Sequence, residues 1–97
     1  MRKSEAVAQV ELLWAIAIGP AGAGRTTQLQ RAVHALRMSA PTGYVREKVQ
    51  SAESMVEIWN SPRRWQQWGR EQARSNAILA VGKLREAVDT DWPPDPE

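Results

Sequence analysis

The sequence of 97 residues has no cysteine and no phenylalanine, and it has only one histidine. The absence of cysteine excludes a disulfide framework, cysteine-ligated zinc and a catalytic thiol. His34 stands alone, and no His, Asp or Cys accompanies the pair Glu53 and Glu57 to complete a metal site. No set of nucleophile, base and orienting residue can be assembled either. We therefore expect a protein that is not an enzyme, without catalytic residues, metal or cofactor.

Long hydrophobic runs are also missing. The most apolar stretch, 12–18, follows a basic start at Arg2 and Lys3 but falls far short of the roughly 20 residues that cross a bilayer. Glu5 and Glu11 lie in or next to the segment that would be the apolar core of a signal peptide. These features lead us to expect a cytoplasmic protein and no membrane partner.

The small size of the chain sets a limit on how stable it can be alone. A domain of this length buries only roughly 60–65% of the surface of its unfolded chain. Its hydrophobic fraction of 42% is enough for a globular core. We therefore expect a single small domain that gains stability from a partner.

Charge is distributed unevenly along the chain. Thirteen Lys and Arg stand against eleven Asp and Glu, for a formal net charge of +2. From Arg25 to Arg85 there are eleven basic and four acidic residues, whereas from Glu86 to Glu97 there are five acidic residues and no basic one. The acidic tail is either a solvated segment that aids solubility or a segment that folds back on the basic face and competes there with an anionic partner.

Apolar residues recur at helical spacing in four segments, which predicts an all-α fold. The predicted helices cover about 4–18, 26–38, 44–59 and 62–88, and an acidic, proline-rich tail follows at 89–97. Thr26 or Thr27 is expected to cap the second helix, Thr42 the third and Ser61 the fourth, with Pro62 at its first position. We expect a small four-helix bundle, or an assembly of helical hairpins, with a long C-terminal helix.

Two of these segments differ in how clearly they are helical. Segment 44–59 is the clearest, because its apolar residues repeat at the spacing of a coiled-coil seam: Val45, Val49, Ala52, Val56 and Trp59. Segment 4–18 is apolar nearly all round, and the alternation within 10–18 also fits a buried strand. A helix is favoured there by the alanine content and the charged start, but the strand stays open.

Plotted as one continuous helix, 62–88 places its residues on three sides. The side expected to face the body consists of Ala73, Ala77, Ala80, Val81, Leu84 and Val88. A second side carries Trp65, Trp68 and Leu79, which are either core residues over the preceding helix or an exposed patch that recruits a second chain.

The third side is a stripe of arginines that includes Arg63, Arg70 and Arg74. These residues, with Arg64, either form solvated ion pairs with Glu53 and Glu57 or contact phosphates, since they alternate with tryptophans as in some nucleic-acid surfaces.

One stretch has the form of a chemical motif. In 19–26 a glycine, four residues, Gly24, Arg25 and Thr26 follow in order, which resembles the Walker A loop of the P-loop NTPases. The resemblance implies phosphate binding by Gly24, Arg25 and Thr26, with Arg25 at the position of the family's lysine and Thr26 at that of the magnesium ligand. No later strand ends in Asp, and every Asp lies at 89 or beyond. We therefore favour a flexible turn between helices, with weak anion binding as a lesser possibility.

Taken together, these features predict a non-enzymatic helical module that acts by protein–protein contact and self-associates, in a regulatory or structural role. The expected contacts are Trp65, Trp68, Leu79, Arg63, Arg70 and Arg74. The alternative is a nucleic-acid-binding regulator that uses Arg63, Arg64, Arg70 and Arg74.

Overall fold

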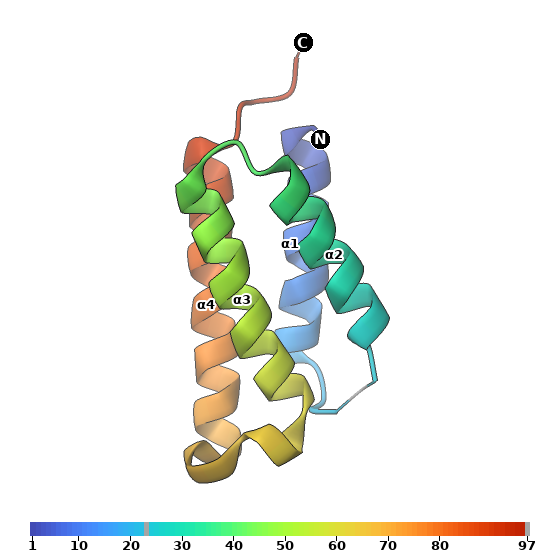
Figure 1. Cartoon of the computed structure of the whole chain (residues 1–97), viewed down its shortest axis with the longest axis vertical. Helices are drawn as coiled ribbons and strands as arrows, with labels where there is room; N and C mark the ends of the chain where they lie inside the picture. The colour runs from blue at the N-terminus through green and yellow to red at the C-terminus, as the bar shows by residue number, and fades with distance from the viewer. Residues whose placement is uncertain (23, 97) are drawn as a thin grey trace.

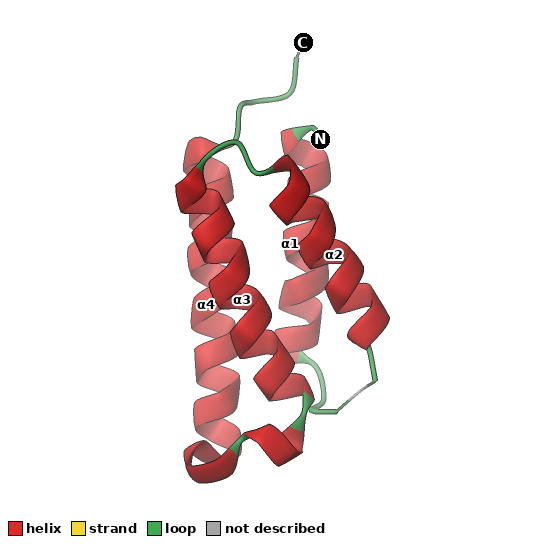
Figure 2. Cartoon of the chain, in the orientation of Figure 1, coloured by secondary structure: helices red, strands yellow, loops and turns green. Residues whose placement is uncertain are grey.

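Four antiparallel helices run up and down the long axis of the molecule (Figure 1). The computed structural model describes residues 1–22 and 24–96, and these contain helices and no strand (Figure 2). The helices are α1 (Lys3–Ile18), α2 (Thr26–Ser39), α3 (Gly43–Asn60) and α4 (Gly69–Asp91), and two 3₁₀ turns, η1 (Pro62–Arg64) and η2 (Gln66–Trp68), connect α3 to α4. The predicted all-α bundle is confirmed, and residues 10–18 are helical rather than extended.

Each helix packs against its neighbours in a ring, as in up-and-down four-helix bundles. α1 and α3 each contact both α2 and α4, and they also contact each other across the bundle. The predicted seam of α3 is buried along its whole length, and so is the predicted inward side of α4. Burial of one such aliphatic side chain stabilises the fold by about 1.5–3 kcal/mol, so these stripes hold the helices together.

The position of α1 explains part of its apolar character. It lies against three other helices, and it buries residues at helical spacing: Ala6, Val10, Leu13, Ile16 and Ala17. Val7, Leu12 and Ile18 remain 38–49% exposed around this buried face.

The boundaries of the last helix differ from the prediction. Instead of running over 62–88, α4 begins at Gly69 and continues to Asp91. Gln66 has φ 50 and Gly69 has φ 75, and these left-handed backbone angles cannot occur inside a right-handed α-helix. At the other end the helix stops at Trp92, whose backbone is extended (φ −78, ψ 127) because Pro93 follows it.

The helix caps follow the sequence in part. Thr42 caps α3 as predicted, since its Oγ1 accepts a hydrogen bond from the backbone N–H of Val45 at 3.2 Å. Neither threonine caps α2, because Thr26 is already the first helical residue and Arg25 occupies the N-cap position without a side-chain cap bond. Ser61 likewise makes no side-chain cap bond, and Pro62 opens η1 rather than α4.

The molecule is a rod with two different ends, measuring 46 × 21 × 18 Å. The hairpin end contains the α1–α2 connection and the turns η1 and η2, and the terminal end contains both termini and the α2–α3 turn (Figure 1). Among the described helices, none combines the length and apolarity needed to cross a bilayer.

Candidate interaction surfaces

A buried tryptophan organises the hairpin end. The Trp59 side chain is fully buried, and its Nε1 donates a hydrogen bond to the carbonyl oxygen of Ile16 at 3.1 Å. The ring of Trp65 stacks on it, with 5.5 Å between centroids and 8° between planes. The Arg74 guanidinium lies over the Trp59 ring, 4.3 Å from its centroid. Trp59 therefore joins α1, η1, η2 and α4 into one cluster.

Arg74 closes the end of α1. The last carbonyls of a helix have no intrahelical partners, and α1 has no basic residue in its last turn. Arg74 supplies the missing donors from α4, since its two terminal nitrogens bond the carbonyl oxygens of Ile18 at 2.8 Å and Gly19 at 2.9 Å. Two of the predicted partner-binding residues, Trp65 and Arg74, are thus engaged within the chain.

The three residues Trp65, Trp68 and Leu79 do not share a helix face as predicted, because 62–68 is not α-helical. Trp65 packs on the core, whereas Trp68 is half-buried and lines a pocket of about 250 Å³ with Ile58, Arg64, Trp65 and Gln66. Leu79 lies elsewhere, on the outer side of α4, and is 61% exposed. The predicted contact residues therefore belong to two separate surfaces.

The predicted arginines also differ in their surroundings. Arg63 and Arg70 are exposed and form no ion pair within the described part of the chain. Arg64 pairs with Glu57 at 3.7 Å, and solvent reaches both side chains, so this pair contributes little to stability. Of the ion pairs considered for these arginines, the structure forms the one between Arg64 and Glu57, whereas Glu53 pairs with Arg37 instead.

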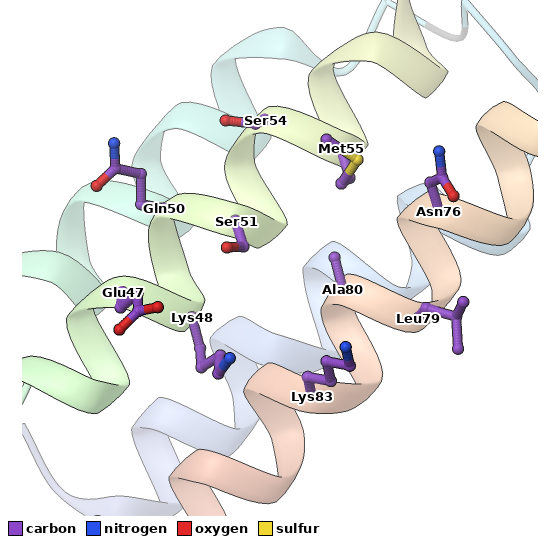
Figure 3. Close-up of a pocket in the computed structure, with 10 residues that line it drawn as sticks. All are labelled: Glu47, Lys48, Gln50, Ser51, Ser54, Met55, Asn76, Leu79, Ala80 and Lys83. Carbon is purple, nitrogen blue, oxygen red and sulfur yellow. The ribbon is translucent and has the colours of Figure 1, made fainter. Parts of the chain in front are cut away.

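The second surface is a groove of about 550 Å³ between α3 and α4 (Figure 3). Met55 and Ala80 lie between the two helices, and Leu79 points away from α3 on the outer side of α4. Small and uncharged residues, Ser51, Ser54 and Asn76 among them, make up most of the remaining lining. Glu47, Lys48 and Lys83 carry the charges of this groove, all toward its terminal end.

The acidic tail is fastened to the N-terminus, at the opposite end from Arg63, Arg64 and Arg70 (Figure 1). Trp92 is 4% exposed, and its Nε1 donates to the carbonyl oxygen of Met1 at 3.2 Å. The backbone N–H of Ser4 donates to Asp95 Oδ1 at 3.2 Å. Hydrogen bonding by the Ser4 side chain, and to a lesser degree by this backbone N–H, lowers the pKa of the Asp95 carboxyl. The described part of the tail, up to residue 96, therefore does not fold back on the basic face, and part of it belongs to the bundle.

The segment that resembles a Walker A loop joins two helices, with α1 where the motif requires a strand. Gly24 has φ 71, and Arg25 Nε donates to Gln28 Oε1 at 2.9 Å. Thr26 lines a small pocket together with Asn60, which is 9% exposed and whose Oδ1 accepts no hydrogen bond from the described residues. Glu57 and Arg64 line the same pocket and pair with each other at 3.7 Å, so the pocket carries both signs of charge.

Comparison of the chain with protein families, with curated proteins and with solved structures finds no match. In the part of the chain that the structure describes, no three carboxylate or imidazole side chains come close enough to hold a metal ion. The two surfaces described above are therefore the basis on which function can be argued.

Proposed function

We propose that this protein is a small non-enzymatic interaction module that self-associates through its α3–α4 face, the surface formed by the groove and by Ser75, Leu79 and Gly82 on the outer side of α4. The observation that carries the proposal is the 61% exposure of Leu79 beside a groove with few charges. Burial of a large aliphatic side chain by a partner lowers the free energy of the complex. A regulatory or structural role fits a protein that acts by contact alone.

Gly82 supports close approach of a second helix to this face. A Cβ added there would meet nothing within 4 Å, so packing inside the chain does not require glycine. Glycine in a helix interior costs about 1 kcal/mol relative to alanine, and no gain within the chain offsets that cost. Contact with a second copy would account for a small residue at this position.

The pattern of charge on α4 favours an antiparallel pair of helices. If two copies meet about a two-fold axis at Leu79, Ser75 faces Lys83 of the other copy and Gln72 faces Glu86. No like charges then lie opposite each other. A parallel pair would instead place Lys83 against Lys83 and Glu86 against Glu86, and such repulsion is destabilising.

Sedimentation velocity across a range of concentrations tests self-association. We expect a dimer at ~100 μM protein and dissociation on dilution. Leu79→Glu should give a monomer with unchanged helicity, because each copy would bring a charge into the shared apolar contact. Met38→Glu is the matched control, since Met38 is 72% exposed on α2 and lies outside the α3–α4 face. A wild-type protein that stays monomeric at the highest concentration overturns the proposal.

Gly82→Ala tests the geometry of the contact. In dilute protein the substitution should raise the free energy of unfolding by about 0.5–1 kcal/mol, because alanine favours the helix. The added methyl group should at the same time weaken self-association, which sedimentation would detect. Equal or tighter association of the variant would contradict the antiparallel contact through Gly82.

A further inference from the structure

Positive charge without carboxylate partners gathers at the hairpin end. Arg63 and Arg70 are exposed at the same end of the rod as Arg64, which pairs with Glu57, and Glu71 lies next to Arg70 in the chain. The other ion pairs in the described part of the chain, Lys3–Asp89, Arg37–Glu53 and Arg85–Glu11, use arginine and lysine side chains outside this cluster. Arg63, Arg64 and Arg70 therefore form a basic surface at the hairpin end of the rod.

An aromatic pocket opens within this cluster of arginines. Trp65 and Trp68 both line it, and Arg64 completes it from η1. Gln66, which follows Trp65 and also lines the pocket, has φ 50, a left-handed conformation that non-glycine residues seldom adopt. The ring of Trp65 is already held in place by stacking on Trp59 and by a hydrogen bond from its Nε1 to the Trp59 carbonyl oxygen at 3.4 Å.

We infer that the hairpin end binds single-stranded nucleic acid. A base would stack in the pocket on Trp65 and Trp68, and the flanking phosphates would contact Arg63, Arg64 and Arg70. A planar ring binds well to tryptophans that are already placed, because little side-chain freedom is lost on binding. The ligand is a single strand because an unpaired base enters a pocket without the free-energy cost of breaking a base pair. An acidic protein surface would use the arginines but leave the aromatic pocket empty.

Fluorescence anisotropy with a labelled oligothymidine of about 12 nucleotides measures the interaction. We expect binding at ~50 mM salt that weakens about tenfold to twentyfold by ~200 mM, as three phosphate contacts to a single strand would give. Trp68→Leu should weaken binding about fivefold to a hundredfold without changing the salt dependence, because it removes stacking and no charge. Trp68→Tyr should restore most of the affinity, a rescue that a merely structural role of the tryptophan would not produce.

Matched charge variants separate this surface from a general effect of net charge. Arg63→Gln with Arg70→Gln should weaken binding at least tenfold. The slope of log affinity against log salt concentration should also become shallower, by the amount that about two phosphate contacts contribute. Arg31→Gln with Arg46→Gln removes the same charge from exposed positions on α2 and α3, and should change affinity less than twofold.

Four results would overturn the inference. They are the absence of binding at the lower salt concentration, an equal loss in the two arginine pairs, equal affinity for polyglutamate, and equal affinity for duplex DNA of the same length. Polyglutamate would identify an acidic protein as the better partner, and duplex DNA would show that no base enters the pocket. Each of these measurements is independent of Leu79, so the Leu79→Glu variant should bind the oligonucleotide like the wild type.

Discussion

The two ends of the bundle are fastened in different ways. At the hairpin end, Trp59 is fully buried and Arg74 gives two hydrogen bonds to the end of α1. At the terminal end, Trp92 is buried and its bond to Met1 is part-buried, whereas the bonds from Ser4 to Asp95, from Thr42 to Asp91 and from Lys3 to the Asp89 carbonyl lie at the surface. The fully buried bond is at the hairpin end, from Trp59 to Ile16, and a bond that excludes water contributes more than bonds that water can replace. The comparison indicates that the hairpin end determines global stability and that the terminal end can open alone.

The largest effect should come from Trp59→Ala. This change removes a buried ring, its hydrogen bond to Ile16 and the support of Trp65, so we expect the free energy of unfolding to fall by about 3–5 kcal/mol. Urea denaturation followed by circular dichroism measures the loss. A decrease below about 1.5 kcal/mol would show that the hairpin end does not control stability.

Arg74→Met should have an intermediate effect. Methionine keeps much of the apolar stem but removes both bonds to α1, so we expect a loss of about 1–3 kcal/mol. Arg85→Met is the matched control, because Arg85 also lies over a tryptophan, 4.6 Å from the Trp14 centroid, but bonds an exposed Glu11 instead of helix carbonyls. The control should lose less than about 1 kcal/mol. Equal losses would show that capping of α1 adds nothing.

The smallest effect is a local change with pH at the terminal end. Hydrogen bonding by the Ser4 side chain, and then by its backbone N–H, places the pKa of folded Asp95 below its ordinary value of 3.8. This contact therefore stabilises the folded tail above that value and is lost as pH falls through the folded pKa. The amide signal of Ser4 in NMR spectra should therefore titrate with a midpoint below 3.8. Asp95→Asn should abolish this titration while leaving the urea midpoint at neutral pH nearly unchanged. A Ser4 titration at or above the ordinary value would contradict the contact.

Much of the fold could be predicted, because apolar residues at helical spacing mark the side of each helix that is buried. The seam from Val45 to Trp59 and the inward side of α4 are both buried as the spacing indicated. Residues 10–18 were harder, because apolar residues such as Leu12 and Ile18 also occupy the solvent-facing side of α1, and the segment then alternates like a strand. Its alanines and its charged first turn were the available signals.

The surfaces were less predictable, because a single local turn changes how the side chains before it are oriented relative to those after it. The left-handed Gln66 breaks the helix, and the pattern of 62–68 gives no sign that a glutamine adopts this conformation. Trp65 then turns onto Trp59, and Leu79 remains on a different surface. Arg74 was assigned to a partner because its true acceptors, the carbonyls of Ile18 and Gly19, lie more than fifty residues away in the chain. The absence of a basic residue from the last turn of α1 was a signal that a donor must come from elsewhere.

Exposed arginines, Arg63 and Arg70 among them, give the hairpin end of the rod a basic surface. At the terminal end acidic and basic residues lie together, since Lys3 bonds Asp89 there. A polyanion would consequently attract the hairpin end before contact and orient the rod. An antiparallel pair formed through Leu79 would point its two hairpin ends in opposite directions, so the two copies would meet separate stretches of a strand or two different strands.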